Sequence, residues 1–233
     1  MHLGSLQQKN PKKNRDWGLR SFKIKLCGDA EADFGIPAQI AEVLEAHGND
    51  YFCTLDGNEQ FEDAKQFYDF WLTVLADPKL EKLARSVQIV EQQISRVKAL
   101  RAPLGQLGDL VSVEIDESDA DIHAFPKAIA LGYRGVSSKS CKGIYRSLIN
   151  RARVESLNQG AGSGAGAYLM SAEDLSTQAG VALQQDLSLA TVIGCTHVER
   201  NGHQYGDGLS GMSEHWRNTL QVAHSDMYVV QGD

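Results

Sequence analysis

Short apolar stretches alternate along the chain with longer segments whose apolar residues recur at helical spacing. The short stretches carry β-branched and aromatic residues, which are typical of strands. They predict strands within residues 21–29, 51–59, 86–93, 111–118, 133–143, 167–174 and 196–202. The longer segments predict helices within residues 37–48, 62–77, 97–100, 122–131, 144–158 and 177–194.

Two of the predicted helices carry clear local signals. The helix at 37–48 has Pro37 at its start and Gly48 at its stop, the positions that these residues favour. The helix at 62–77 has one continuous apolar face, formed by Phe67, Phe70, Trp71 and Val74. We therefore expect this second helix to pack against the core.

The alternation of strand and helix predicts parallel strands joined by helical crossovers, either in an α/β barrel or in a doubly wound sheet. Polar residues decide between the two, because one stands at the end of each of six predicted strands: Lys25, Asp56, Glu91, Asp116, Lys139 and Glu173. In a closed barrel such residues converge on one mouth, where barrel enzymes place their chemistry. We therefore predict an α/β fold of the TIM-like (β/α) barrel type.

Composition narrows the range of partners. The 233 residues carry a net charge of −7, and basic residues gather only within the first 25 positions, so a nucleic-acid surface is not expected. No run is apolar enough for a signal peptide or a membrane span. The four cysteines form no CxxC pair, which argues against a zinc or redox motif and favours a reducing cytoplasm.

The segment after the fourth predicted strand is crowded with acids: Glu114, Asp116, Glu117, Asp119 and Asp121. A solvated turn would explain this cluster alone. Three carboxylates at adjacent strand ends, however, would repel one another unless a cation lay between them. Oxygen ligands without clustered His or Cys favour magnesium, with manganese as the alternative. Positive charge nearby would lower the pKa of a flanking lysine from about 10.4 towards about 7 to 8, where its amine can act as a base.

Five strand-end motifs occur in a specific order: KIK (23–25), LDGNE (55–59), IVEQQ (89–93), IDES (115–118) and SSKSCKG (137–143). In this order and spacing, from about Ser21 to Gly208, they resemble the barrel of the enolase superfamily, in particular the mandelate racemase/muconate-lactonizing enzyme family. The resemblance implies a magnesium-dependent enzyme that removes an α-proton from a small carboxylate substrate, as a racemase or epimerase, a cycloisomerase or a dehydratase.

The resemblance also implies roles for individual residues. Lys25 and Lys139 would be the acid/base catalysts, and Lys23 would lie near the substrate carboxylate. The metal ligands would be Asp56, Glu91 and Asp116. Glu117 is the alternative to Asp116, and Lys142 is the alternative to Lys139.

Two further acids follow later strands. Glu173 is a candidate for lining the substrate pocket, with capping of the next helix as the alternative. Glu199, with the neighbouring His197 and His203, is a candidate for contacting substrate, although a histidine there is more often structural.

The expected organisation is a basic tail at 1–20, the barrel at 21–208 and a tail at 209–233. A first barrel strand and an N-terminal capping domain, which members of this family have, are not found before Ser21, so the barrel is expected to be incomplete. Its open sheet edges would favour a homo-oligomer. Two other functions remain open: a non-catalytic remnant of the fold, and a class I aldolase with a Schiff base on Lys139.

Overall fold

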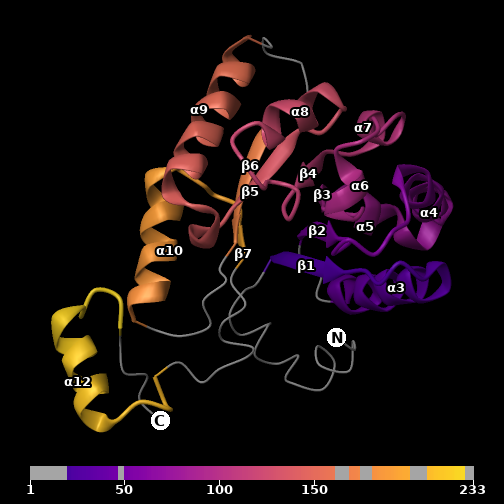
Figure 1. The fold of residues 1–233 in the computed structure, drawn as a ribbon. Helices are drawn as coiled ribbons and strands as arrows, with labels where there is room; N and C mark the ends of the chain where they lie inside the picture. The colour runs from indigo at the N-terminus through magenta and orange to yellow at the C-terminus, as the bar shows by residue number, and fades with distance from the viewer. Residues whose placement is uncertain (1–19, 47–49, 161–167, 174–179, 200–208, 229–233) are drawn as a thin grey trace. The chain divides into compact units, whose positions relative to one another are not determined.

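The computed structural model describes residues 20–46, 50–160, 168–173, 180–199 and 209–228 (Figure 1). Its strands are β1 (Ser21–Lys25), β2 (Phe52–Asp56), β3 (Val87–Glu91), β4 (Val113–Ile115), β5 (Gly135–Ser138), β6 (Leu169–Glu173) and β7 (Val198–Glu199). The α-helices are α3 (Ala30–Glu45), α4 (Ala64–Ala76), α5 (Glu81–Ser86), α6 (Arg96–Ala99), α7 (Leu107–Leu110), α8 (Ala124–Ala130), α9 (Ile144–Gly160), α10 (Val181–Val192) and α12 (Glu214–Ala223). Two 3-10 helices, η1 (Pro78–Leu80) and η2 (Ser140–Lys142), complete the described elements.

The strands form one sheet in which spatial order follows chain order from β1 to β7. The pairs β1–β2, β2–β3, β3–β4, β4–β5 and β6–β7 are all parallel. A doubly wound sheet reverses its strand order at a switch point, whereas a (β/α) barrel adds each strand beside the last. The sequential order is therefore that of the predicted TIM-like barrel.

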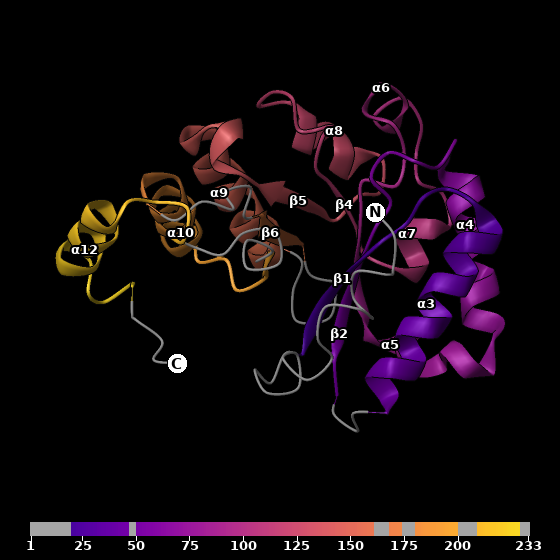
Figure 2. The ribbon, with the colours of Figure 1, turned by 90° about the horizontal axis from the view of Figure 1, so that it is seen from below.

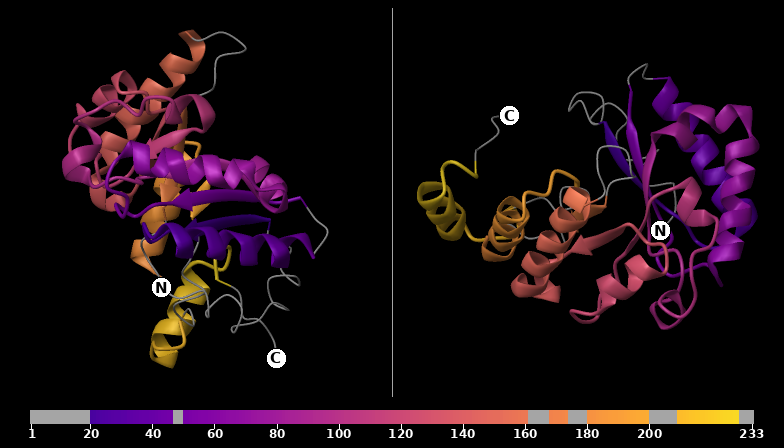
Figure 3. Two further views of the ribbon diagram at one scale, coloured as in Figure 1. Left: turned by 90° about the vertical axis from the view of Figure 1, so that its right-hand side faces the viewer. Right: turned by 90° about the horizontal axis from the view of Figure 1, so that it is seen from above.

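Contacts within the chain divide it into two compact units. The first unit comprises Met1–Val136 with Leu157–Leu169, and the second comprises Ser137–Ser156 with Met170–Asp233. In the first unit, α3 runs alongside β1 and β2 (Figures 2 and 3). In the second unit, α10 lies between α12 and the β6–β7 pair (Figure 1).

In the first unit, side-chain alternation gives the sheet one apolar and one polar face. The register places Ile24 beside Leu55, Leu55 beside Val90, and Val90 beside Val113, and all four side chains are buried. Because successive side chains of a strand point to opposite faces, the residue after each of these belongs to the other face. That polar row consists of Lys25, Asp56, Glu91 and Glu114.

Aromatic packing secures α4 within the first unit. Phe67 is fully buried, and its ring centroid lies 4.9 Å from that of Phe61 and 5.6 Å from that of Phe70, in edge-to-face arrangements. Trp71 and Val74 are also buried. The apolar face predicted for this helix is therefore confirmed.

Each predicted strand contains an observed strand, and the first five observed strands are shorter than predicted. Residues 167, 174 and 200–202 of the last two predicted strands lie outside the described residues. The predicted start of the first helix is wrong, because α3 begins at Ala30 and Pro37 lies inside it. Asp29 caps this earlier start, since its side chain accepts a hydrogen bond from the N–H of Ala32. Gly48, the predicted stop, lies outside the described residues. None of the described helices is long and apolar enough to cross a membrane.

Candidate metal centre

Three adjacent strands bring the predicted metal ligands to the same end of the sheet. Asp56 is the last residue of β2 and Glu91 the last of β3, and the two are register partners. Asp116 follows the end of β4 by one residue. It stands two positions beyond Glu114, the partner of Glu91, so it continues the same polar face.

The three carboxylates are almost completely removed from solvent. Asp56 is 1% exposed, and Glu91 and Asp116 are each 2% exposed. A carboxylate oxygen of Glu91 and one of Asp116 lie within 4.8 Å of each other. Burying several negative charges so close together is costly unless positive charge compensates them.

Two lysines from β1 provide such compensation. The Lys23 Nζ lies 2.6 Å from a carboxylate oxygen of Glu91 and 3.4 Å from one of Asp56. Lys25, the register partner of Asp56, donates a hydrogen bond to the same Asp56 oxygen. The side chain of Lys23 is 13% exposed and that of Lys25 is 48% exposed. Lys25 is therefore the lysine of this pair that a molecule from solvent can reach.

The loop after β2, residues 57–61, fixes the carboxylate of Asp56. The other oxygen of Asp56 accepts a hydrogen bond of 2.8 Å from the backbone N–H of Asn58, which has a positive φ of 43°. Gly57 lets this loop approach the next one, because a Cβ at Gly57 would lie 2.4 Å from the Cα of Gln93. The LDGN motif is thus explained by a tight turn through the backbone of Asn58.

The donor set fits a hard divalent cation. Asp56, Glu91 and Asp116 offer carboxylate oxygens only, which are the ligands that magnesium and manganese prefer. All three are buried acids whose negative charge a cation would compensate, and the ammonium of Lys23 lies between Asp56 and Glu91. The chemistry of these residues therefore fits a hard divalent cation.

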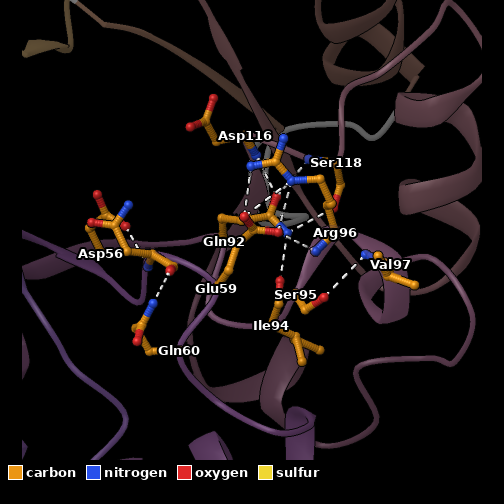
Figure 4. A network of polar contacts seen from close by, with 11 residues as sticks. Asp56, Glu59, Gln60, Gln92, Ile94, Ser95, Arg96, Val97, Asp116 and Ser118 are labelled. Carbon is orange, nitrogen blue, oxygen red and sulfur yellow. Dashed lines mark hydrogen bonds and ion pairs between the residues drawn. The ribbon is translucent and has the colours of Figure 1, made fainter.

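Gln92 connects the loops that carry these acids (Figure 4). Its side-chain oxygen accepts hydrogen bonds from the backbone N–H groups of Asp116, at 2.9 Å, and Ser118, at 3.0 Å. Its amide nitrogen donates to the Ser118 hydroxyl and to the Ile94 carbonyl, both at 2.7 Å. The sequence predicts no role for Gln92, and its one signal is its place directly after the predicted ligand Glu91.

A second link lies beside Gln92. The carboxylate of Glu59 accepts two-pronged hydrogen bonds from the guanidinium of Arg96, the shortest at 2.7 Å (Figure 4). These bonds hold the pKa of Glu59 below its ordinary value. Glu59 also has a positive φ of 63°. The pair joins the loop after β2 to the start of α6.

The remaining predicted site residues belong to the second unit. The Nζ of Lys139 lies 2.6 Å from a carboxylate oxygen of Glu173, which is 8% exposed and ends β6. Glu199 ends β7, is half-buried and is the register partner of Glu173. The structure thus brings Lys139 and Glu173 together and places Glu199 beside Glu173 in the sheet.

The alternatives for Asp116 and Lys139 have different surroundings. Glu117 is half-buried, whereas Asp116 is buried. Lys142 donates hydrogen bonds of 2.9 Å to the carbonyl and the hydroxyl of Ser137. His197 is half-buried and its carbonyl accepts a backbone hydrogen bond from Ala172, while His203 lies outside the described residues.

The fold has close counterparts among solved structures. A mandelate racemase/muconate lactonizing enzyme from Roseiflexus sp. superposes with a TM-score of 0.62 at 15% identity, over 83% of this chain and 51% of that one. A mandelate racemase/muconate lactonizing protein from Herpetosiphon aurantiacus gives 0.60 at 18% identity, over 83% and 50%. A dipeptide epimerase from Methylococcus capsulatus, complexed with Mg and the dipeptide L-Arg-D-Lys, gives 0.57 at 17% identity, over 84% and 49%.

These counterparts confirm the fold suggested by the sequence motifs. The chain spans about half the length of the solved structures that it matches. Neither protein-family models nor curated proteins give a match to the sequence.

Proposed function

We propose that this chain, which has the α/β barrel fold of the mandelate racemase and muconate lactonizing enzymes, is a magnesium-dependent enzyme of the enolase superfamily. Its reaction would be removal of a proton from the carbon next to a carboxylate, in a racemisation, epimerisation, cycloisomerisation or dehydration. The observation that carries the proposal is the cluster that Lys23 and Lys25 of β1 form with Asp56 and Glu91 at the ends of β2 and β3. Asp116 stands one residue beyond the end of β4, the next strand of the sheet.

In this proposal Asp56, Glu91 and Asp116 hold the divalent cation. The bound cation supplies positive charge that stabilises the negative charge developing on the substrate carboxylate during proton removal. Magnesium also accompanies the dipeptide in the Methylococcus epimerase, which has the same fold. That parallel supports magnesium as the metal, with manganese as the alternative.

The lysines have separate roles in the proposal. Lys25, which is partly exposed at the end of β1, takes the α-proton on its Nζ and returns it. Lys23 is more deeply buried and binds the substrate carboxylate once its contacts with Asp56 and Glu91 are released. Lys139 is assigned the second acid/base role on the strength of the sequence resemblance, and Glu173, its ion-pair partner, would orient it. Glu199 is assigned to substrate binding.

Exchange of the α-proton with solvent tests this function without knowledge of the final product. The protein is incubated in D2O with Mg²⁺ and a panel of α-hydroxy acids and dipeptides, and deuterium uptake is followed by ¹H NMR. We expect uptake into at least one compound, loss of uptake when EDTA removes the metal, and a fall of about 10²-fold or more in Lys25→Met. Lys79→Met, which changes an exposed lysine of η1, is the matched control.

Three outcomes would contradict the proposal. Exchange that persists in Lys25→Met would remove this lysine from the proton transfer. Magnesium binding without exchange into any member of the panel would favour a metal-binding protein that has no turnover. Trapping of a carbonyl compound on Lys139 by borohydride would instead favour the aldolase alternative, which gives the three buried acids no role.

A further inference from the structure

We infer that Gln92 is the positioning residue of the metal centre: it fixes the loop after β4, residues 116–120, so that the Asp116 carboxylate is held ready for the cation. This inference rests on the proposed function, because it concerns the same three ligands. It assigns a specific task to a side chain that contributes no ligand atom to the proposed site.

The first argument is the completeness of the Gln92 hydrogen bonding. An amide side chain has an oxygen that accepts two hydrogen bonds and a nitrogen that donates two. Gln92 uses all four, with the backbone N–H groups of Asp116 and Ser118 on its oxygen and the Ser118 hydroxyl and Ile94 carbonyl on its nitrogen. The residue is 1% exposed, so loss of these bonds would leave buried polar groups unsatisfied.

The second argument is that the Gln92 backbone joins the same loops. Its N–H donates to the carbonyl of Glu114 at 3.1 Å, and its carbonyl accepts from the N–H of Glu59 at 2.8 Å. Gln92 therefore contacts the segments that follow β2 and β4 as well as its own. Each of the three proposed ligands lies within three residues of a Gln92 contact or of Gln92 itself.

The third argument is backbone strain. Gln92 has a φ of 30°, in the left-handed region that residues other than glycine rarely adopt. Such a conformation costs about 1 kcal/mol or more and persists only where the surroundings hold it. Here it turns the chain directly after Glu91, and the Gln92 side chain reaches the backbone N–H groups of Asp116 and Ser118 (Figure 4).

The test measures binding of Mg²⁺ alone by isothermal titration calorimetry, with Mn²⁺ and electron paramagnetic resonance as a second probe. Gln92→Met keeps the length of the side chain but cannot accept the two N–H groups. We expect it to weaken Mg²⁺ binding by about tenfold, as is typical when a residue supporting a ligand is lost. Gln92→Glu retains an acceptor for both N–H groups but loses the two donated hydrogen bonds, so we expect it to weaken Mg²⁺ binding less than Gln92→Met does, by about threefold.

The matched control is Tyr133→Phe, which removes one buried hydrogen bond of 3.1 Å to the Ala99 carbonyl in the same unit. This control variant should have a lower unfolding temperature and an unchanged Mg²⁺ affinity. If the affinity of Gln92→Met fell only because the protein was less stable, Tyr133→Phe would lose Mg²⁺ affinity as well. If Gln92→Met does not fold, Ser118→Ala decides, because it deletes only the hydroxyl on the Gln92 nitrogen. We expect that variant to bind Mg²⁺ about threefold more weakly.

The inference alone is overturned if folded Gln92→Met binds Mg²⁺ as tightly as the wild type does. It is also overturned if Gln92→Glu loses as much affinity as Gln92→Met. If Gln92→Met does not fold, unchanged Mg²⁺ affinity in Ser118→Ala overturns it. Failure of the wild-type protein to bind either metal would overturn the proposed function and, with it, the role of Gln92. The two failures are therefore distinguishable.

Discussion

At the scale of single residues, Lys23 has the most informative position, because its ammonium lies between two buried carboxylates. We predict that Lys23→Met lowers the unfolding free energy of the metal-free protein by about 3 kcal/mol, since it leaves Asp56 and Glu91 without this counter-charge. Chemical denaturation in EDTA measures the loss. Adding Mg²⁺ should recover more stability in the variant than in the wild type.

The control for this experiment is Lys65→Met. Lys65 forms an exposed ion pair with Asp69 one helical turn away, and its loss should leave the unfolding free energy unchanged within error. An equally small effect of Lys23→Met would show that Lys23 does not stabilise the acids.

A second residue-scale prediction concerns pH. The hydrogen bonds from Arg96 hold the pKa of Glu59 below its ordinary value of 4.5. A carboxylate with a lowered folded-state pKa contributes stability above its unfolded-state pKa, and that contribution is lost as the pH falls through the folded-state value. The unfolding free energy of Arg96→Gln should therefore be lower than that of the wild type, and this difference should be largest at neutral pH. It should be at most about 1 kcal/mol, because the ion pair is partly exposed.

The same difference should shrink as the pH falls below about 4.5. Urea denaturation between neutral and acid pH measures it, and Arg101→Gln, an exposed arginine outside this network, is the control. A difference that stays constant over the whole range would contradict the role of the Glu59 charge.

Site residues differed in how far the sequence could predict them. The strand-end positions of Asp56, Glu91 and Asp116 were predictable because polar residues follow the buried part of each strand and parallel strands share that end. Their role as metal ligands stays a prediction. Gln92 was not, because its role depends on a left-handed backbone turn and on hydrogen bonds to residues 24 and 26 positions away. Glu114 was seen only as one of a cluster of acids, although the register makes it the neighbour of Glu91.

At the scale of elements, the packing of α4 gives a direct prediction. Phe67→Ala should lower the unfolding free energy by about 3 to 5 kcal/mol, because it leaves a cavity among Phe61 and Phe70. Leu72→Ala, on the exposed side of the same helix at 40% exposure, should cost about 0.5 kcal/mol. Chemical denaturation measures both losses of unfolding free energy. Equal losses in the two variants would contradict the assignment of the buried face of α4.

Element existence was easier to predict than element boundaries. The apolar periodicity of α4 identified its buried residues because a long amphipathic helix repeats the signal several times. For α3, the predicted start at Pro37 lies within the helix, and the capping side chain of Asp29 places the observed start at Ala30, seven residues earlier. The helices α5, α7 and α12 were not predicted. α5 and α7 have only six and four residues, which carry little periodicity, although α6, also of four residues, was predicted.

At the scale of the whole molecule, the alternation of strands and helices predicted parallel strands joined by crossovers. The polar residues at six strand ends then favoured a barrel, in which spatial order follows chain order, as the sheet does. The division into two compact units did not follow from it. That division depends on contacts between segments far apart in the chain, such as Leu157–Leu169 with the first 136 residues, which no local pattern reports.

The last prediction concerns the stability of the entire chain in the presence of metal. A ligand that binds only the folded state stabilises it by about 2.7 kcal/mol at a concentration of 100 times its dissociation constant. For a chain of 233 residues this corresponds to a rise in the unfolding temperature of about 5 to 10 °C. We expect Mg²⁺ to produce this rise, EDTA to reverse it, and Asp116→Asn to abolish it, because the buried carboxylate of Asp116 is one of the three proposed ligands. Asp109→Asn, which removes an exposed acid of α7, should respond as the wild type does, and NaCl at equal ionic strength should give no comparable rise. A rise of the same size in Asp116→Asn would mean that Mg²⁺ binds elsewhere on the protein. The positive charges that compensate the buried acids would then be those of Lys23 and Lys25, which already form ion pairs with Asp56 and Glu91.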